Sequence, residues 1–186
     1  MIKMMYKHLK TICKHKAIVC RECIRCGFIW RGLMHDNSKF GLTEFLPSAK
    51  NFQGHRSPID AEKERNEYSL AWLHHMGHNP HHWEYWIDFN TEGQIVANKI
   101  PYEYVVEMVC DWIGAGMTYN KSKWTQAEPL SYYNKVRRGR HFHPETEALI
   151  MKFLECIRDN GLKEFYKMAR TAHVARRYTG KENDHD

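Results

Sequence analysis

The sequence has 186 residues, of which 42% are hydrophobic and 27% are charged, which excludes a disordered chain. It contains no apolar run near the roughly 20 residues of a membrane-spanning helix, so no membrane partner is expected. The formal net charge of +6 favours an anionic partner, either a phosphorylated small molecule or nucleic acid.

The first eight residues lack the apolar centre and cleavage site of a signal peptide, which predicts a cytoplasmic protein. The six cysteines are then expected to be free thiols unless they bind metal or carry out redox chemistry. Cys20, Cys23 and Cys26 repeat every three residues, but on a helix they are better explained as small buried side chains than as a zinc site.

A first helix is predicted from Ile2, because apolar residues recur at alternating steps of three and four. This core-facing stripe comprises Met5, Leu9, Ile12, Val19, Cys23, Cys26, Trp30 and Leu33, with Lys16 as the one misfit. An unbroken helix would separate His15 from His35 by about 30 Å. Gly27 is the better of two glycines, Gly27 and Gly32, at which the helix can end and the chain can reverse.

Further helices are predicted from helix-starting residues and apolar spacing. They cover Thr43–Ala49, Asp60–Gly77, a segment starting at Pro80, a segment from Pro101 through Ile113, Glu145–Asn160 and Leu162–Arg176. Residues 51–58, 88–98 and 120–144 are expected to form loops, the last with at most short structure. The sequence therefore predicts an all-α, single-domain helical bundle over residues 1–177 and a flexible tail over residues 178–186.

Histidine is unusually frequent, with 13 residues, several of them between Leu73 and Trp83. His35 and Asp36 are adjacent at a predicted turn, where both can reach one divalent ion if the backbone departs from a regular helix. Asp111 lies in an almost wholly apolar helix, where a buried carboxylate needs a metal or a basic partner. A reversal of the chain after the first helix would also bring His15 beside His35 and Asp36.

This pattern resembles the HD superfamily of metal-dependent phosphohydrolases, whose signature is a histidine, a later His-Asp pair and a distant aspartate. The matching residues are His15, His35, Asp36 and Asp111, and His35 to Lys39 is similar to the His-Asp-x-x-Lys form common there. The resemblance implies a helical HD-like fold and a divalent transition metal (Mn, Fe, Co, Ni or Zn) that activates water for attack on phosphorus.

Some members of that superfamily hold a second ion with extra histidines between the pair and the last aspartate. The candidates here are His74, His75, His81 and His82, although their spacing is narrower than in those relatives. One ion or two are therefore expected.

Three further residues are candidates for the catalytic machinery. The resemblance suggests that Lys39 contacts a substrate phosphate, although it can equally be an exposed turn residue. Glu44 and Glu107 can each act as a general base or orient a ligand histidine.

The chain also resembles an uncharacterised family of bacterial and phage proteins known only as a domain of unknown function. The strings that carry this resemblance are Ser57–Asp60, Ala71–His75, His81–Trp86 and Glu107–Asp111. It covers most of the chain and implies no activity.

The leading prediction is a phosphohydrolase that acts on a nucleotide or another small phosphate ester. One alternative is a non-catalytic protein that binds nucleic acid or a protein partner through the basic segments Lys7–Lys16 and Arg137–Arg140, with binding that weakens in salt. Another is a purely structural metal, enclosed by four protein ligands.

Overall fold

Helix α1 (Ile2–Arg25) is followed by a turn in which Gly27 has a φ of 91°. Glycine adopts this left-handed conformation without steric cost, and the chain reverses there into α2 (Ile29–Met34). The reversal predicted at Gly27 is confirmed. The computed structural model describes residues 2–179, so the predicted tail at 178–186 lies outside the described residues except for its first two, which belong to the last helix.

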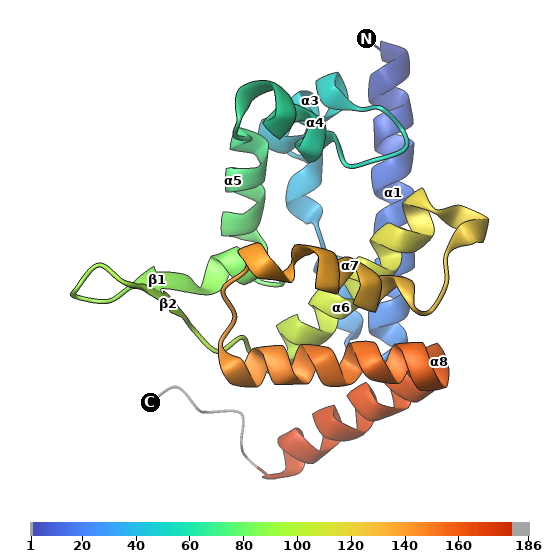
Figure 1. Ribbon diagram of the computed structural model, residues 1–186. Helices are drawn as coiled ribbons and strands as arrows, with labels where there is room; N and C mark the ends of the chain where they lie inside the picture. The colour runs from blue at the N-terminus through green and yellow to red at the C-terminus, as the bar shows by residue number, and fades with distance from the viewer. Residues whose placement is uncertain (1, 180–186) are drawn as a thin grey trace.

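Helices continue along most of the chain (Figure 1). After α2 the elements are η1 (Asn37–Phe40), α3 (Leu42–Asn51), α4 (Pro58–Asn66), α5 (Leu70–His78), η2 (Trp83–Trp86), β1 (Ile87–Phe89), β2 (Ile95–Ala97), α6 (Tyr102–Tyr119), η3 (Lys121–Lys123), α7 (Glu128–Val136), η4 (Arg137–Gly139) and α8 (Pro144–Thr179), where η denotes a 3-10 helix. Within residues 2–179 the only strands are β1 and β2, an antiparallel hairpin that projects away from the helices in Figure 1.

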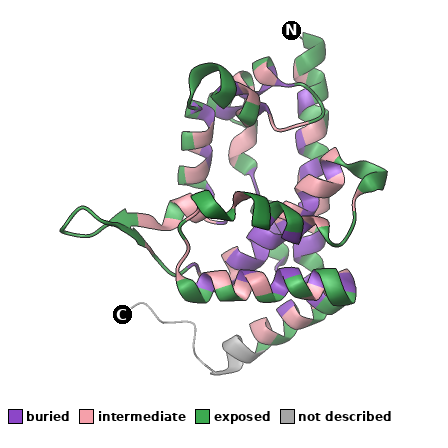
Figure 2. Cartoon of the chain, viewed as in Figure 1, coloured by how far each residue is buried: buried purple, intermediate pink, exposed green. Residues whose placement is uncertain are grey.

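Helix α6 lies at the centre of the hydrophobic core, between α1 and α8. Its Val109 and Ile113 are completely buried, as are Val19 of α1 and Leu154 of α8. Figure 2 shows the buried residues gathered where these helices meet, while the hairpin is largely exposed. One core thus joins the N- and C-terminal helices, and the predicted all-α, single-domain fold is confirmed.

Helices α1 and α6 approach each other closely at Gly114. A Cβ atom at this position would lie 2.4 Å from Cγ2 of Val19, closer than two carbon atoms can pack. His15 lies four residues before Val19, and Asp111 lies three residues before Gly114. Both are therefore about one helical turn from the tightest contact, on neighbouring helices.

The predicted helix Asp60–Gly77 is wrong, because two helices occupy this segment. Helix α4 ends where Glu67 takes up a left-handed conformation with a φ of 68°. Ser69 then begins α5 by accepting a hydrogen bond from the backbone N–H of Trp72 at 3.0 Å. The Ser69 hydroxyl also donates to Glu62 of α4 at 2.6 Å, which fixes the corner between the helices.

The predicted helix starting at Pro80 is also wrong, since the backbone at Asn79 and His82 is extended and leads into η2 and the hairpin. Residues 120–144 contain α7, which exceeds the short structure expected there. The two predicted C-terminal helices form α8, with the expected interruption at Gly161, whose φ is 83°.

The predicted apolar stripe of α1 and α2 is buried only in part. Val19, Cys23 and Cys26 are completely buried, but Trp30 and Leu33 are 65% and 49% exposed. The turn at Gly27 explains the difference, because it removes α2 from the direction of α1. Among the described helices, none combines the length and the apolar character that crossing a membrane requires.

Candidate metal centre

The corner between α2 and η1 places His35 and Asp36. Asp36 adopts the left-handed conformation, with φ 54° and ψ 26°, which aspartate tolerates better than most residues. Lys16 of α1 donates hydrogen bonds to the backbone oxygens of Leu33 at 2.9 Å and His35 at 2.5 Å. The residue that interrupts the apolar stripe of α1 therefore ties this corner to the helix that carries His15.

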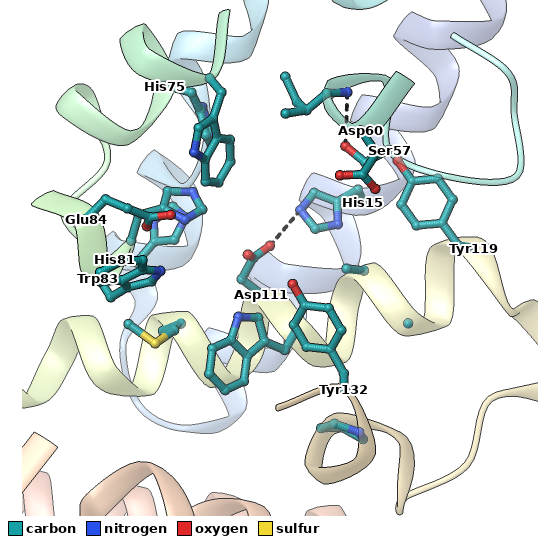
Figure 3. A pocket seen from close by; sticks show the side chains of 18 of the residues that line it. His15, Ser57, Asp60, His75, His81, Trp83, Glu84, Asp111, Tyr119 and Tyr132 are labelled. Atoms are coloured by element: carbon teal, nitrogen blue, oxygen red, sulfur yellow. Dashed lines mark hydrogen bonds and ion pairs between the residues drawn. The ribbon is translucent and has the colours of Figure 1, made fainter. Parts of the chain in front are cut away.

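Four side chains from α1, the corner and α6 converge, and we call them the carboxylate-rich group: His15, His35, Asp36 and Asp111. His15 Nε2 lies 3.0 Å from Asp111 Oδ1 and 3.5 Å from Asp36 Oδ2. His35 Nε2 lies 3.3 Å from Asp36 Oδ2 and 3.4 Å from Asp111 Oδ1. Figure 3 shows His15 and Asp111 facing each other. The structure thus brings together the residues predicted to share one ion.

A second set, the histidine-rich group, consists of Asp36, His75, His81 and His82. The other oxygen of Asp36, Oδ1, lies 3.3 Å from His75 Nε2 and 3.5 Å from His81 Nε2. One ligand atom from each member lies within 4.8 Å of the others. Asp36 therefore offers one oxygen to each group.

The residues in both groups fit a divalent metal ion. Ligands bound tetrahedrally at about 2.1 Å are separated by about 3.4 Å, close to the distances in the carboxylate-rich group. In the histidine-rich group, Asp36 Oδ1 and the Nε2 atoms of the three histidines are buried and have no hydrogen-bond partner among the described residues. Buried polar atoms are normally satisfied, and a shared cation would satisfy all four.

Glu107 orients one histidine from each group. Its Oε1 lies 2.9 Å from His35 Nδ1 and 3.1 Å from His81 Nδ1, with both side chains almost completely buried. A histidine that donates from Nδ1 to a carboxylate presents the lone pair of Nε2 on its other side. This geometry favours the orienting role of Glu107 over that of a general base.

Glu44 plays the same part for His75. Glu44 Oε2 lies 2.8 Å from His75 Nδ1, and Glu44 Oε1 lies 2.7 Å from His74 Nδ1. His74 belongs to neither group, and its ring stacks against His78 with centroids 3.9 Å apart. Of the clustered histidines predicted as ligands, the structure places His75, His81 and His82 at the centre and His74 outside it.

The sequence analysis missed two polar residues that contact His75. Ser38 Oγ lies 3.3 Å from His75 Nδ1, and the Asn79 amide donates to the backbone oxygen of His75 at 2.7 Å and to Ser38 Oγ at 2.8 Å. The sequence contains no signal that singles these residues out, because their position depends on the corner at Asp36 and on the end of α5.

We call the residues of both groups together the cluster, and opposite charges stabilise each other within it. Burial opposes the protonation of His35, but Asp36 and the neighbouring carboxylates outweigh it and raise the His35 pKa well above its usual value. Burial likewise opposes ionisation of Asp36 and Asp111, yet the surrounding basic groups hold both pKa values well below the usual range. For His82, burial and then His81 lower the pKa well below its usual value.

The cluster forms one wall of a cavity of about 470 Å³ (Figure 3). Its other walls are largely aromatic, formed by Trp72, Trp83, Trp112, Tyr119 and Tyr132. Three basic side chains line it as well. Lys39 donates to Asp36 Oδ2 at 2.5 Å, Lys63 lies 5.0 Å from the centre of the Trp72 ring, and Arg140 lies 5.2 Å from that of Trp112. Acidic side chains, among them Glu84, line it too.

Comparison with protein-family models identifies one relationship for this architecture. A family of unknown function, DUF5662, matches residues 4–156, which include every residue of both groups. The chain belongs to this family, and the resemblance to an uncharacterised family is confirmed. No curated protein and no solved structure matches the chain.

Proposed function

We propose that this member of the DUF5662 family is an HD-like, metal-dependent phosphohydrolase that acts on a small phosphate ester, with a nucleotide as the favoured substrate. The observation that carries the proposal is the position of Asp36, whose two oxygens each belong to a separate ligand group beside one cavity. Two ions that share a carboxylate are a recurring arrangement in enzymes that transfer phosphoryl groups.

The ligands are supplied by residues that the sequence places far apart. His15, His35, Asp36 and Asp111 would hold one ion, and Asp36, His75, His81 and His82 would hold the other. When bound, divalent ions supply Lewis-acid charge at the phosphoryl group and activate water for attack on phosphorus. Glu107 and Glu44 keep the ligand histidines oriented.

Lys39 is placed to bind the phosphate. Its ammonium group lies against Asp36 at the edge of the cluster, lines the cavity and is 32% exposed. Burial opposes its charge, but Asp36 and Asp111 outweigh burial and raise the Lys39 pKa, so this residue stays protonated. A fixed cation next to the ligands can bind a phosphoryl oxygen that points away from them.

The aromatic walls support a substrate with a planar ring. Trp72 and Trp112 line the cavity, and each already has a cation near its ring, Lys63 and Arg140 respectively. Aromatic side chains stack on nucleobases, and the two cations complement an anionic ester. The combination favours a nucleotide over a small aliphatic phosphate.

The cavity also bears on the alternatives. A purely structural metal needs a closed set of ligands, whereas His15, Asp111 and the histidines of the second group border an open cavity. In the basic segments considered for nucleic-acid binding, Lys16 is engaged with backbone oxygens and Arg140 lies over Trp112 in the cavity wall. These contacts favour a pocket for a small molecule over an extended basic surface.

The test starts from purified protein stripped of metal and reloaded with Mn²⁺, Co²⁺ or Zn²⁺. Release of inorganic phosphate from p-nitrophenyl phosphate and from nucleoside monophosphates is then measured. We expect hydrolysis that requires an added ion, and no hydrolysis by Asp36→Ala. Protein that binds ions but hydrolyses none of these esters would refute the proposal.

A further inference from the structure

We propose that the two ligand groups fill in a fixed order, the histidine-rich group first and more tightly, and that the ion in the carboxylate-rich group is the exchangeable one. His82, as the third imidazole, creates this difference. The inference depends on the proposed function only in requiring that the cluster binds divalent ions, and it holds whatever reaction the site catalyses.

The first observation concerns hydrogen bonding before an ion binds. In the histidine-rich group, Asp36 Oδ1 and the Nε2 atoms of His75, His81 and His82 are all buried, and none has a hydrogen-bond partner in the part of the chain that the structure describes. An ion that binds there satisfies four polar atoms that lack hydrogen bonds, among which Asp36 Oδ1 has only the long ion-pair contacts to His75 Nε2 at 3.3 Å and His81 Nε2 at 3.5 Å. No existing hydrogen bond has to be broken in exchange.

The carboxylate-rich group differs, because its members already satisfy one another. His15 Nε2 lies 3.0 Å from Asp111 Oδ1, a shorter contact than those of Asp36 Oδ1 with His75 and His81 in the histidine-rich group, at 3.3 and 3.5 Å. Lys39 adds a further ion pair with Asp36 Oδ2, the oxygen on this side of the cluster. An ion that enters this group must replace these interactions, which lowers the net gain on binding.

The second observation is that the rings of the histidine-rich group are held in place. Glu44 fixes His75, and Glu107 fixes His81 through their Nδ1 atoms. The His82 ring packs against Trp72, with centroids 4.8 Å apart, and against His81, with centroids 4.2 Å apart. Ligands that are ordered before binding lose less conformational freedom when the ion arrives.

The two groups also favour different ions. Three imidazoles and one carboxylate oxygen suit Zn²⁺, Co²⁺ or Ni²⁺, because imidazole is a preferred ligand of these metals. Two imidazoles and two carboxylates form a harder site, which accepts Mn²⁺ more readily. When two kinds of ion are present, we therefore expect a mixed centre, with Zn²⁺, Co²⁺ or Ni²⁺ in the histidine-rich group and Mn²⁺ in the carboxylate-rich group.

The decisive experiment uses the wild-type chain and Co²⁺ alone. Crystals of metal-stripped protein are soaked with a limiting amount of Co²⁺, and anomalous scattering locates the ion. We expect one peak, between Asp36 and the three histidines. A peak between His15 and Asp111, or equal peaks at both positions, would overturn the order proposed here.

A calorimetric titration with Co²⁺ gives the affinities. We expect two steps that differ at least about tenfold in dissociation constant. Asp111→Asn should remove the weaker step and leave the tighter one, whereas His82→Asn should weaken the tighter step by at least about 10–100-fold, the loss typical when even an outer partner of a ligand is removed. Circular dichroism establishes that each variant is folded. Loss of the tighter step in folded Asp111→Asn protein would contradict the inference.

The outcomes separate this inference from the proposed function. Ordered binding of Co²⁺ without ester hydrolysis would refute the hydrolase and leave the order of loading intact. Ester hydrolysis by a protein whose two sites bind Co²⁺ equally well would support the hydrolase and refute the order of loading. Protein that binds no Co²⁺ at either position would overturn both.

Discussion

His15 Nε2 and Asp111 Oδ1 lie 3.0 Å apart, about one helical turn from the close approach of α1 and α6 at Gly114. Val19 follows His15 by one turn of α1, and Gly114 follows Asp111 by about one turn of α6. The packing that closes the hydrophobic core therefore also sets the distance between two predicted ligands. Substitutions in the core contact and in the cluster should have separable effects on stability and on metal binding.

Gly114→Ala should destabilise the protein, because the new methyl group would lie 2.4 Å from Cγ2 of Val19. Overpacking of this kind typically costs about 1–3 kcal/mol, or roughly 2–12 °C in Tm for a chain of this size. Thermal unfolding measures it. Gly77→Ala is the matched control, since a Cβ atom there meets no other atom within 4 Å and alanine favours helix α5. Equal Tm values for the two variants would contradict the close packing of α1 on α6.

Asp36→Asn should reduce the metal content of both groups, because each oxygen of Asp36 belongs to a different group. Asparagine keeps the size of the side chain but offers only one oxygen and no charge. Elemental analysis of the purified protein, together with phosphate release, checks this. Asp88→Asn on the exposed hairpin serves as the control. An Asp36→Asn variant that retained two ions per chain would rule out the shared carboxylate.

Glu107→Gln should weaken both groups, since Glu107 contacts His35 and His81. Loss of a carboxylate that orients a ligand histidine typically costs about 10–100-fold in metal affinity or activity. Titration of Co²⁺ into metal-stripped protein provides the measurement. Glu103→Gln, one turn earlier on α6, is the comparison, and its affinity should match that of the unaltered chain. If both variants bound Co²⁺ equally well, Glu107 would have no orienting role.

Lys39→Met should reduce kcat/KM for a phosphate ester without reducing the metal content. Lys39 lies beside the ligands and is not one of them, and a hydrogen bond to a charged group contributes about 1.5–3 kcal/mol, or roughly 10–100-fold. Steady-state kinetics with parallel metal analysis separates these effects. Lys50→Met on the exposed side of α3 is the control. Unchanged kcat/KM in Lys39→Met would remove Lys39 from phosphate binding.

His8 should make the folded state sensitive to acid. Burial, and then the charge of Lys39, lower the His8 pKa from 6.5 to about 4, and both ring nitrogens are buried without a hydrogen-bond partner among the described residues. The unfolded chain therefore binds more protons than the native protein between these values. The free energy of unfolding falls as the pH drops from 6.5 to about 4, by at most about 3 kcal/mol for this residue.

Urea unfolding of metal-stripped protein at several pH values tests the effect of His8. In His8→Phe, which keeps an aromatic ring beside Phe45 and Phe52, the acid-dependent loss should be smaller than in the unaltered chain. His55→Gln, at an exposed loop position, should lose stability to the same extent as the unaltered chain. Parallel pH profiles for His8→Phe and the unaltered chain would contradict the prediction.

The elements that the sequence predicted best have a strong local signal. Helix α6 is apolar on almost every turn. Gly27 and Gly161 have positive φ angles, which residues with a side chain adopt only with strain, so these glycines mark where the helices are interrupted. The break between α4 and α5 was missed because charged helix-forming residues continue up to Glu67. There the capping serine and its contact with Glu62, a tertiary interaction, decide where one helix ends.

The candidate site was predictable only where the fold depends on local signals. The reversal at Gly27 was enough to bring His15 back to the His35–Asp36 corner. The roles of the clustered histidines were not predictable, because they depend on where α5 ends. The extended backbone after His78 turns His81 and His82 toward Asp36 and leaves His74 on the outer side of α5.

Two corners of the backbone carry consecutive cluster residues, His35 with Asp36 and His81 with His82. Each pair shares one peptide unit, so a rotation that improves the position of one side chain displaces its neighbour. Asp36 also links the pairs through its two oxygens. A displacement of either corner therefore changes the distances between Asp36 and the histidines beside it, and with them the geometry of the metal ligands.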